Sequence, residues 1–395
     1  MARIIWLVVL SISLALGVIA FHALQREWAL QASIDESAQR HERSKLAYLE
    51  KTAPDVEFVR RILDKPVNPD RNLRPTHGIR LATTGQLMAG RFTEIERTAT
   101  RLHETRELLE SGTSKLAGFY SGLAQPATEC PQKGGEESQW DAMSDRIDEW
   151  AASGNPLALM AQLGFQRSLA WCARGTGPAD SVSDENWAVF HQRTAAAVKL
   201  FEALPSAAGE QPWYADIALG LHRDGDLMSR SEALDLYERA RARDPWFLAL
   251  YFTRGTLAAP KWGGSIGEHA AWVEQEIARA ETPDMAAVLY ARLNWANESS
   301  KMFAEGGVDW PRFEESFERI IEFYPDQWNI NSFGNFACHA NDRERLYTQL
   351  QSMEVVLIQA WHNLDYYQRC RDYVLRNQYE KSILERARQR PPAEG

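Results

Sequence analysis

The chain has 395 residues, of which 45% are hydrophobic, so it is long enough to bury a sizeable core. Its 44 Lys and Arg residues against 54 Asp and Glu residues give a formal net charge of −10. Proteins that bind nucleic acid neutralise phosphates with clustered basic side chains, and this sequence has no concentrated basic stripe. We therefore expect no nucleic acid partner, and the charge argues mainly for solubility.

The sequence begins with an uncharged apolar segment, IIWLVVLSISLALGVIAF, at residues 4–21. This segment is long enough to cross a bilayer, with Arg3 before it and Arg26 after it. We predict an uncleaved transmembrane anchor over residues 1–24, with the bulk of the chain exported. The alternative is a cleaved secretory signal, for which Ala20 offers a small residue at the end of the apolar run.

A charged segment without glycine follows the anchor, from Trp28 to about Leu63, and is typical of a membrane-proximal helix or stalk. Pro66, Pro69 and Pro75 then break the pattern. The predicted organisation is a membrane-proximal helix and Pro-rich linker over 25–75, a helical-repeat domain over 76–385, and a disordered tail over 386–395.

In the repeat domain, apolar residues recur at helical spacing. The stripes are Phe92, Ile95, Ala99, Leu102 and Leu109; Trp140, Met143, Ile147 and Trp150; and Trp187, Phe190, Thr194, Val198 and Phe201. Asn155-Pro156 and Thr282-Pro283 mark helix starts, because a capping side chain precedes a proline, and Gly175 marks a helix end. No run of alternating apolar residues indicates a sheet. The sequence predicts an all-α fold.

Two segments of the chain share one pattern. Leu236–Ala258, LYERARARDPWFLALYFTRGTLA, aligns with Ser316–Cys338, SFERIIEFYPDQWNINSFGNFAC, at a constant offset of 80 residues. In both, an amphipathic helix ends, Asp and Pro mark a turn, and a tryptophan (Trp246 or Trp328) opens the next helix. This helix–turn–helix unit is typical of tetratricopeptide-like arrays, in which stacked helix pairs bury their apolar faces as an α-solenoid.

Four cysteines, Cys130, Cys172, Cys338 and Cys370, can form disulfides in an exported chain. We favour Cys130 with Cys172 and Cys338 with Cys370, because each pair joins neighbouring elements through a moderate loop. The alternative is four buried thiols. No Cys-x-x-Cys occurs, and the nine histidines do not cluster with cysteines at zinc spacing. We therefore expect no metal site and no cofactor.

The chain contains four distinctive stretches: MAGRFTEIERTATRLHETRELLESGTSKLAGFY, AWCARG, APKWGGS and DQWNINSFGNFACHANDRERL. Together they resemble an uncharacterised bacterial family of tetratricopeptide-like proteins, a domain of unknown function, from roughly Leu87 to Met353. The resemblance implies a bacterial origin and an α-helical repeat fold, and it carries over no catalytic residues. Asn341 stands where the family has a glycine at a helix–helix turn, and asparagine is the best substitute for glycine in a left-handed turn.

The stretch Ala259–Glu268 reads APKWGGSIGE. Its glycines match neither the P-loop nor the dinucleotide-binding spacing, which argues against a phosphate site. As a connector, Pro260 stops a helix, Gly263-Gly264 permits backbone angles closed to other residues, and Ser265-x-x-Glu268 makes a capping box. We favour the connector over a ligand loop, which leaves Trp262 without an obvious structural role.

The sequence contains no convincing catalytic motif. His269 follows Glu268 but lacks the His-Glu-x-x-His pattern of zinc hydrolases, and no Gly-x-Ser-x-Gly elbow occurs. His339 and Cys338 are neighbours, and adjacent helix residues point in different directions, so we interpret them as separate packing positions. We therefore predict no catalytic residues.

An aromatic groove is the remaining candidate for a site. Tryptophans on a concave solenoid face can hold peptides or stack on sugars, although tryptophans at helical spacing are more often core residues. Arg174 stands at a predicted helix end, where it either satisfies terminal carbonyls or binds an anion. The candidate ligand-binding residues are Trp171, Arg174, Lys261, Trp262, Trp328 and Asn331.

These features predict a membrane-anchored helical-repeat scaffold that binds a protein or peptide partner in the bacterial envelope. It would be a single-pass inner-membrane protein with its C-terminal domain in the periplasm. The alternative is an envelope enzyme or carbohydrate-binding protein that uses an aromatic-lined groove. A third hypothesis, a cytoplasmic protein, fails if a reporter fused at the C-terminus is active only outside the cytoplasm.

Overall fold

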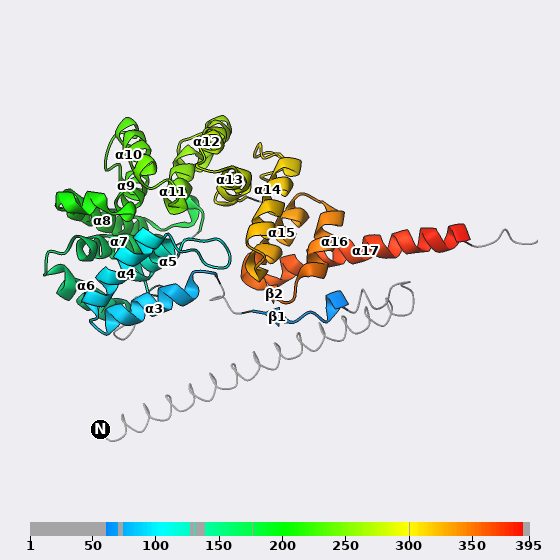
Figure 1. Ribbon diagram of the computed structural model, residues 1–395, viewed down its shortest axis with the longest axis horizontal. Helices are drawn as coiled ribbons and strands as arrows, with labels where there is room; N and C mark the ends of the chain where they lie inside the picture. The colour runs from blue at the N-terminus through cyan, green and yellow to red at the C-terminus, as the bar shows by residue number, and fades with distance from the viewer. Residues whose placement is uncertain are drawn as a thin grey trace, which may run out of the picture. The chain divides into compact units, whose positions relative to one another are not determined.

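The computed structural model describes residues 61–69, 74–126, 130, 139–175, 177–299 and 301–389 (Figure 1). The chain divides into two compact units, and one of them spans Pro66–Cys370. The other combines Met1–Lys65 with Arg371–Gly395. Apart from the C-terminal part of helix α17 (Leu364–Gln389), the features discussed below lie in the unit Pro66–Cys370.

The described part of the chain is helical almost throughout, which confirms the predicted all-α class. Its α-helices are α3 (His77–Met88), α4 (Phe92–Thr105), α5 (Lys115–Ala124), α6 (Gln139–Ala151), α7 (Pro156–Arg174), α8 (Asp184–Glu202), α9 (Pro212–Gly225), α10 (Arg230–Arg243), α11 (Leu248–Ala258), α12 (Ile266–Ala278), α13 (Pro283–Trp295), α14 (Trp310–Phe323), α15 (Gln327–His339), α16 (Arg343–Ser352) and α17 (Leu364–Gln389). Short 3-10 turns are η1 (Ala179–Ser181), η2 (Ser206–Glu210), η3 (Pro260–Trp262) and η4 (Ile358–Trp361).

One small sheet departs from the purely helical prediction. Strands β1 (Val67–Asn68) and β2 (Val356–Leu357) pair in parallel, with Val67 opposite Val356. The backbone N–H of Val356 also donates to the carbonyl oxygen of Pro66 at 2.9 Å. Two-residue strands are too short to produce an alternating apolar pattern, so they leave no signal in the sequence.

The helical stripes predicted from the sequence form much of the core. On α4, Ile95, Ala99 and Leu102 are buried, whereas Leu109 lies beyond the helix end at Thr105. All four stripe residues of α6 are buried as well: Trp140, Met143, Ile147 and Trp150. The hydrophobic effect therefore acts along the faces that the 3.6-residue period indicates.

The predicted helix ends are also confirmed. Asn155 caps α7, because its Oδ1 accepts the backbone N–H of Leu157 at 2.8 Å, and Thr282 caps α13 in the same way. Gly175 ends α7 with φ 74°. Asn341 has φ 57°, so asparagine does occupy the left-handed position between α15 and α16.

The stretch that follows α11 is a tight connector. Helix α11 ends at Ala258, and η3 (Pro260–Trp262) turns the chain. Gly263 then takes φ 85°, a conformation open mainly to glycine. A Cβ on Gly264 would lie 2.0 Å from the carbonyl oxygen of Ala258, so no larger residue fits there without moving the backbone.

The capping box predicted at the start of α12 forms only in part. The Ser265 hydroxyl accepts the backbone N–H of Glu268 at 3.0 Å, as expected. The Glu268 carboxylate, however, accepts from Arg230 at 2.5 Å. A complete capping box occurs instead at the start of α10, between Ser229 and Glu232.

The 80-residue repeat coincides with helix boundaries. Helix α10 runs from 230 to 243 and α14 from 310 to 323, so both of their ends are 80 residues apart. The matched residues Tyr237 and Phe317 are both buried. Each matched glutamate pairs with an arginine later in the chain: Glu238 with Arg279 and Glu318 with Arg345. The two segments therefore share side-chain roles as well as helix positions.

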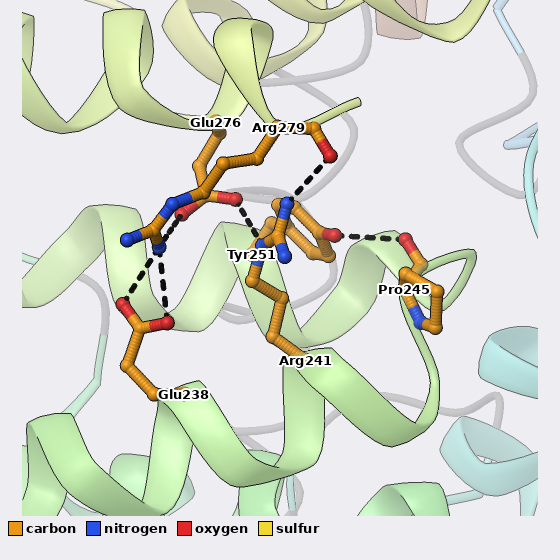
Figure 2. A network of polar contacts seen from close by, with 6 residues as sticks. All are labelled: Glu238, Arg241, Pro245, Tyr251, Glu276 and Arg279. Atoms are coloured by element: carbon orange, nitrogen blue, oxygen red, sulfur yellow. Dashed lines mark hydrogen bonds and ion pairs between the residues drawn. The ribbon is translucent and has the colours of Figure 1, made fainter. Parts of the chain in front are cut away.

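A buried ion pair connects α10 to α12 (Figure 2). The Glu276 side chain is 0% exposed, and its Oε2 accepts from Nε of Arg241 at 2.6 Å. Arg241 also donates to the backbone carbonyl of Arg279 at 2.9 Å. Arg279 in turn reaches both carboxylate oxygens of Glu238 at 3.0 Å. This network ties two successive helix pairs together through charge-assisted hydrogen bonds.

Two disulfides brace the unit. The structure joins Cys130 to Cys172 and Cys338 to Cys370, which is the pairing that the sequence favours. The bridged residues are 42 and 32 positions apart. Closing loops of this length restricts the unfolded chain, an effect worth about 4 kcal/mol for each bridge in the chain-entropy model.

Within the described residues, no helix has the length and apolar character needed to cross a membrane. The apolar segment 4–21, the charged segment up to residue 60 and most of the C-terminal tail lie outside the described residues.

Candidate functional site

Four of the six candidate ligand-binding residues come together around one aromatic contact. Trp171 on α7 meets Trp262 of η3 with ring centroids 6.1 Å apart and planes at 74°. The Arg223 guanidinium, from α9, lies 5.1 Å from the Trp171 ring and 4.7 Å from the Trp262 ring. Arg174 lies 5.2 Å from Trp171 and 5.1 Å from Trp187 of α8. We call Trp171, Arg174, Trp187, Arg223 and Trp262 the tryptophan–arginine cluster.

A buried carboxylate, that of Asp224, positions two side chains of this cluster. Asp224 accepts from Nε1 of Trp171 at 2.8 Å and from Nε of Arg223 at 2.8 Å. Nε of Arg167 donates to the same carboxylate at 2.7 Å. Burial lowers the pKa of Arg223, and the charge of Asp224 opposes that shift. Asp224 therefore fixes both a tryptophan and an arginine of the cluster in orientation.

Two cations at this surface have no carboxylate partner among the described residues. Arg174 donates to the backbone carbonyls of Gly175 and Gly177, at 2.9 and 3.0 Å. Lys261 is exposed, and its Nζ lies 5.9 Å from the Trp262 ring. The two interpretations of Arg174 from the sequence do not exclude each other. The guanidinium donates to carbonyls at the end of α7, and no carboxylate among the described residues neutralises its charge, so it can also attract an anion.

Trp262 itself is half-buried. Its indole Nε1 is shielded from solvent and has no hydrogen-bond partner among the described residues. One indole face carries the Arg223 guanidinium, an arrangement that cation–π attraction stabilises by about 0.5–2 kcal/mol. The ring thus packs between helices and also borders the charged surface.

The other two candidates lie on α15, apart from the cluster. Trp328 is half-buried in the first turn of this helix. Asn331 is 0% exposed, and its Nδ2 donates to the carbonyls of Gln327 and Val355. Its Oδ1 accepts from the backbone N–H of Leu357 and from Nε1 of Trp361. Every hydrogen-bonding group of the Asn331 amide is used, so its role is to hold β2 and η4 against α15.

A separate cavity of about 360 Å³ opens beside η3 and the connector after α13. Its lining includes Lys261, His269, Asn297 and Glu298. Nδ2 of Asn297 lies 2.9 Å from Nε2 of His269. Burial lowers the pKa of His269, and the charge of Arg254 adds to the shift, so the neutral imidazole is favoured. The cavity is therefore lined by several polar groups held in place.

Close to this cavity, three potential metal ligands meet. Glu298, His339 and His362 each offer an atom within 4.8 Å of the other two. A hydrogen bond with Glu298 raises the pKa of His362, whereas burial lowers the pKa of His339. This is the one group of its kind that the described residues contain.

Comparisons of the chain with family models, with curated proteins and with solved structures find no match. The function therefore has to be argued from the site itself.

Several residues at these sites cannot be recognised as site residues from the sequence alone. Arg223 and Asp224 belong to an ordinary helix end in LHRDGD, and nothing local marks them as partners of Trp171. Glu298, His339 and His362 are separated by 41 and 23 residues, which matches no compact ligand spacing. Only the packing of the helices brings these side chains together.

Proposed function

We propose that this chain is a helical-repeat scaffold of the bacterial envelope that binds an acidic segment of a protein partner through the tryptophan–arginine cluster. The observation that carries the proposal is the pair of cations, Arg174 and Lys261, that flank the tryptophans without a carboxylate partner among the described residues. Tryptophan and arginine are the residues that contribute most to protein–protein interfaces.

The charge of the cluster supports an acidic partner. Arg167 and Arg223 both donate to the buried carboxylate of Asp224. Arg174 and Lys261 lie beside the tryptophans instead, near Trp171 and Trp262. The whole chain, by contrast, carries a formal charge of −10. A local positive patch on an acidic protein attracts an acidic partner to one place and repels it elsewhere, which gives orientation as well as affinity.

The helical-repeat part of the proposal rests on the 80-residue match. Helices α10 and α14 have equivalent bounds, and each contributes a glutamate that pairs with an arginine later in the chain. Stacked helix pairs of this kind build extended surfaces for peptides in tetratricopeptide-like arrays. The apolar segment 4–21 and the two disulfides support a tethered protein whose folded part lies in the periplasm.

The carbohydrate-binding alternative receives less support from this cluster. Sugars stack on free aromatic faces, yet Arg174 already lies over Trp171 and Trp187, and Arg223 over Trp171 and Trp262. A carboxylate-bearing peptide, in contrast, can pair with these guanidinium groups at their edges.

The proposal is tested with the full-length chain in a mild detergent. Its affinity is measured for a Glu-rich peptide and for a Lys-rich peptide of equal length, by the change in tryptophan fluorescence. We expect binding of the acidic peptide only, weakening as salt rises. The double variant Arg174→Ala/Lys261→Ala should raise the Kd by roughly 10- to 30-fold, since it removes two charge contacts of about 1 kcal/mol each.

Lys199→Ala on α8 is the control, because Lys199 is exposed and removing it changes the net charge without touching the cluster. It should leave the Kd unchanged. Equal binding of both peptides, or equal effects of the control and the double variant, would count against the proposal. Crosslinking in envelope extracts then identifies the partner as a protein captured by the wild type and lost in the double variant.

A further inference from the structure

The cluster of Glu298, His339 and His362 is built from three separate segments. Glu298 lies in the connector after α13, His339 is the last residue of α15, and His362 directly follows η4. Oε1 of Glu298 lies 3.1 Å from Nε2 of His362. The two imidazole rings are 5.8 Å apart between centroids. Three side chains that are distant in sequence thus converge on one point.

The donor set and the spacing fit zinc. Two imidazoles and one carboxylate are ligands that zinc accepts with bonds of about 2.0–2.2 Å. In a tetrahedral site such bonds place neighbouring ligand atoms about 3.3 Å apart. The pair Glu298 and His362, at 3.1 Å, already has this separation. The remaining ligand atoms lie within 4.8 Å, so a side-chain movement of about 1.5 Å completes the geometry.

His339 carries a ring nitrogen that lacks a partner. Its Nδ1 is shielded from solvent and has no hydrogen-bond partner in the described part of the chain. A buried acceptor without a partner is costly, and coordination of a cation would satisfy it.

Neighbouring groups orient the potential ligands. Nδ2 of Asn335 donates to Oε1 of Glu298 at 3.0 Å. The Tyr366 ring packs beside both imidazoles, with centroids 5.4 Å from His339 and 6.0 Å from His362. Metal ligands in proteins are commonly held by such outer hydrogen bonds and packing contacts.

The backbone around His362 is also held in an uncommon conformation. His362 has φ 65° and ψ −51°, which non-glycine residues rarely adopt. Trp361, directly before it, is buried and donates Nε1 to Asn331 at 3.0 Å. The disulfide Cys338–Cys370 encloses the whole segment and begins next to His339. The fold therefore maintains a strained residue whose side chain faces Glu298.

We propose that Glu298, His339 and His362 bind one zinc ion. Three protein ligands leave a fourth coordination position for water or another ligand. Glu298 also lines the cavity of about 360 Å³, so the ion would lie at the border of a space that a small molecule can enter. The three ligands include no residue of the tryptophan–arginine cluster, although Lys261, beside that cluster, lines the same cavity as Glu298.

The test uses the full-length chain in mild detergent, purified without a histidine tag and stripped with a chelator that is then removed. Zinc binding is measured by isothermal titration and by metal analysis after reloading. We expect one zinc ion per chain. His339→Ala and His362→Ala should each weaken binding by about 100-fold or more, and Asn335→Ala by roughly 10- to 100-fold, the range known for outer-sphere partners.

His191→Ala is the matched control, because His191 is an exposed histidine on α8 outside the three-residue cluster. It should bind zinc like the wild type. Glu298→Gln keeps a hydrogen-bonding side chain but removes the charge, and it should weaken binding without unfolding the chain. Circular dichroism of each zinc-free variant verifies the fold. His362 is half-exposed, so we expect His362→Ala to fold, and it tests the site even if His339→Ala does not fold.

Two outcomes would overturn the proposal. One is a wild-type chain that takes up no zinc. The other is zinc binding that His362→Ala and Glu298→Gln leave unchanged, which would place the ion elsewhere. A plain ion pair between Glu298 and His362 predicts no role for His339 in either measurement, so the His339→Ala result separates that explanation from a metal site.

Discussion

At Gly264 a single methyl group decides whether the chain can follow its path between α11 and α12. A Cβ there would lie 2.0 Å from the carbonyl oxygen of Ala258. We expect Gly264→Ala to lower the free energy of unfolding by about 1–3 kcal/mol, the usual cost of forcing an extra group into a packed position. Chemical denaturation measures the change.

Gly267 provides the matched control for this prediction. It lies inside α12, and a methyl group added there would meet no atom within 4 Å. Gly267→Ala should therefore stabilise the chain by up to about 1 kcal/mol, because alanine loses less backbone freedom in a helix. If both variants shifted the denaturation midpoint in the same direction, the close approach at Gly264 would not control stability.

Residue roles could be predicted from the sequence where the cause is local. Asn341, Asn155 and Thr282 satisfy backbone rules that involve only a few neighbouring positions. Roles that depend on distant partners could not. Trp171 was a candidate from its residue type alone, and its contacts with Asp224 and Arg223 require α7 and α9 to be in place.

At the scale of elements, the junction of α10 and α12 depends on one buried charge. Glu276→Gln would leave the Arg241 guanidinium, whose side chain is 14% exposed, without its counter-charge. We expect a loss of about 3–5 kcal/mol in the free energy of unfolding, because removing one partner leaves the other as a buried charge without compensation. Urea denaturation of the variant gives the value.

Glu238→Gln is the control for this junction. Glu238 also pairs with an arginine, Arg279, but its side chain is 48% exposed. Surface pairs contribute less than about 1 kcal/mol, so this variant should be close to wild type. The double variant Glu276→Gln/Arg241→Gln should lose less stability than the sum of its single changes. Strict additivity would mean that the two side chains do not stabilise each other.

Helices were predictable as elements because their apolar period is long and repeated, as on α4 and α6. The pairing of β1 with β2 was not, because it joins residues 67 and 356 through two residues on each side. The prediction of a capping box at Ser265 is only half correct for a similar reason. Its Glu268 is within reach of Arg230, a charged partner from another helix, and that contact replaces the local one.

At the scale of the whole molecule, the disulfides are expected to set the stability of the unit. Replacing Cys338 and Cys370 by serine removes a bridge across 32 positions and should cost about 4 kcal/mol in the free energy of unfolding. Replacing Cys130 and Cys172 should cost a similar amount. Thermal unfolding of the two serine double variants without reductant measures the two effects separately, and reductant applied to the wild type measures their sum.

The two losses should add, because the bridges connect separate parts of the chain. Each double serine variant keeps one bridge, so reductant should lower its melting temperature less than it lowers that of the wild type. A wild-type chain whose melting temperature is the same in reductant as in its absence would contradict the prediction. Such a result would place the stability in the helix packing alone.

The connector after α13 accounts for a change in the spacing of the helices along the chain. Helices α10, α12 and α14 begin at residues 230, 266 and 310, so the spacing grows from 36 to 44 residues. The added length falls between Trp295 and Trp310, where Glu298 and part of the cavity wall are found. The cavity therefore depends on this connector, and a chain in which the connector is shortened should lose part of the cavity wall together with Glu298.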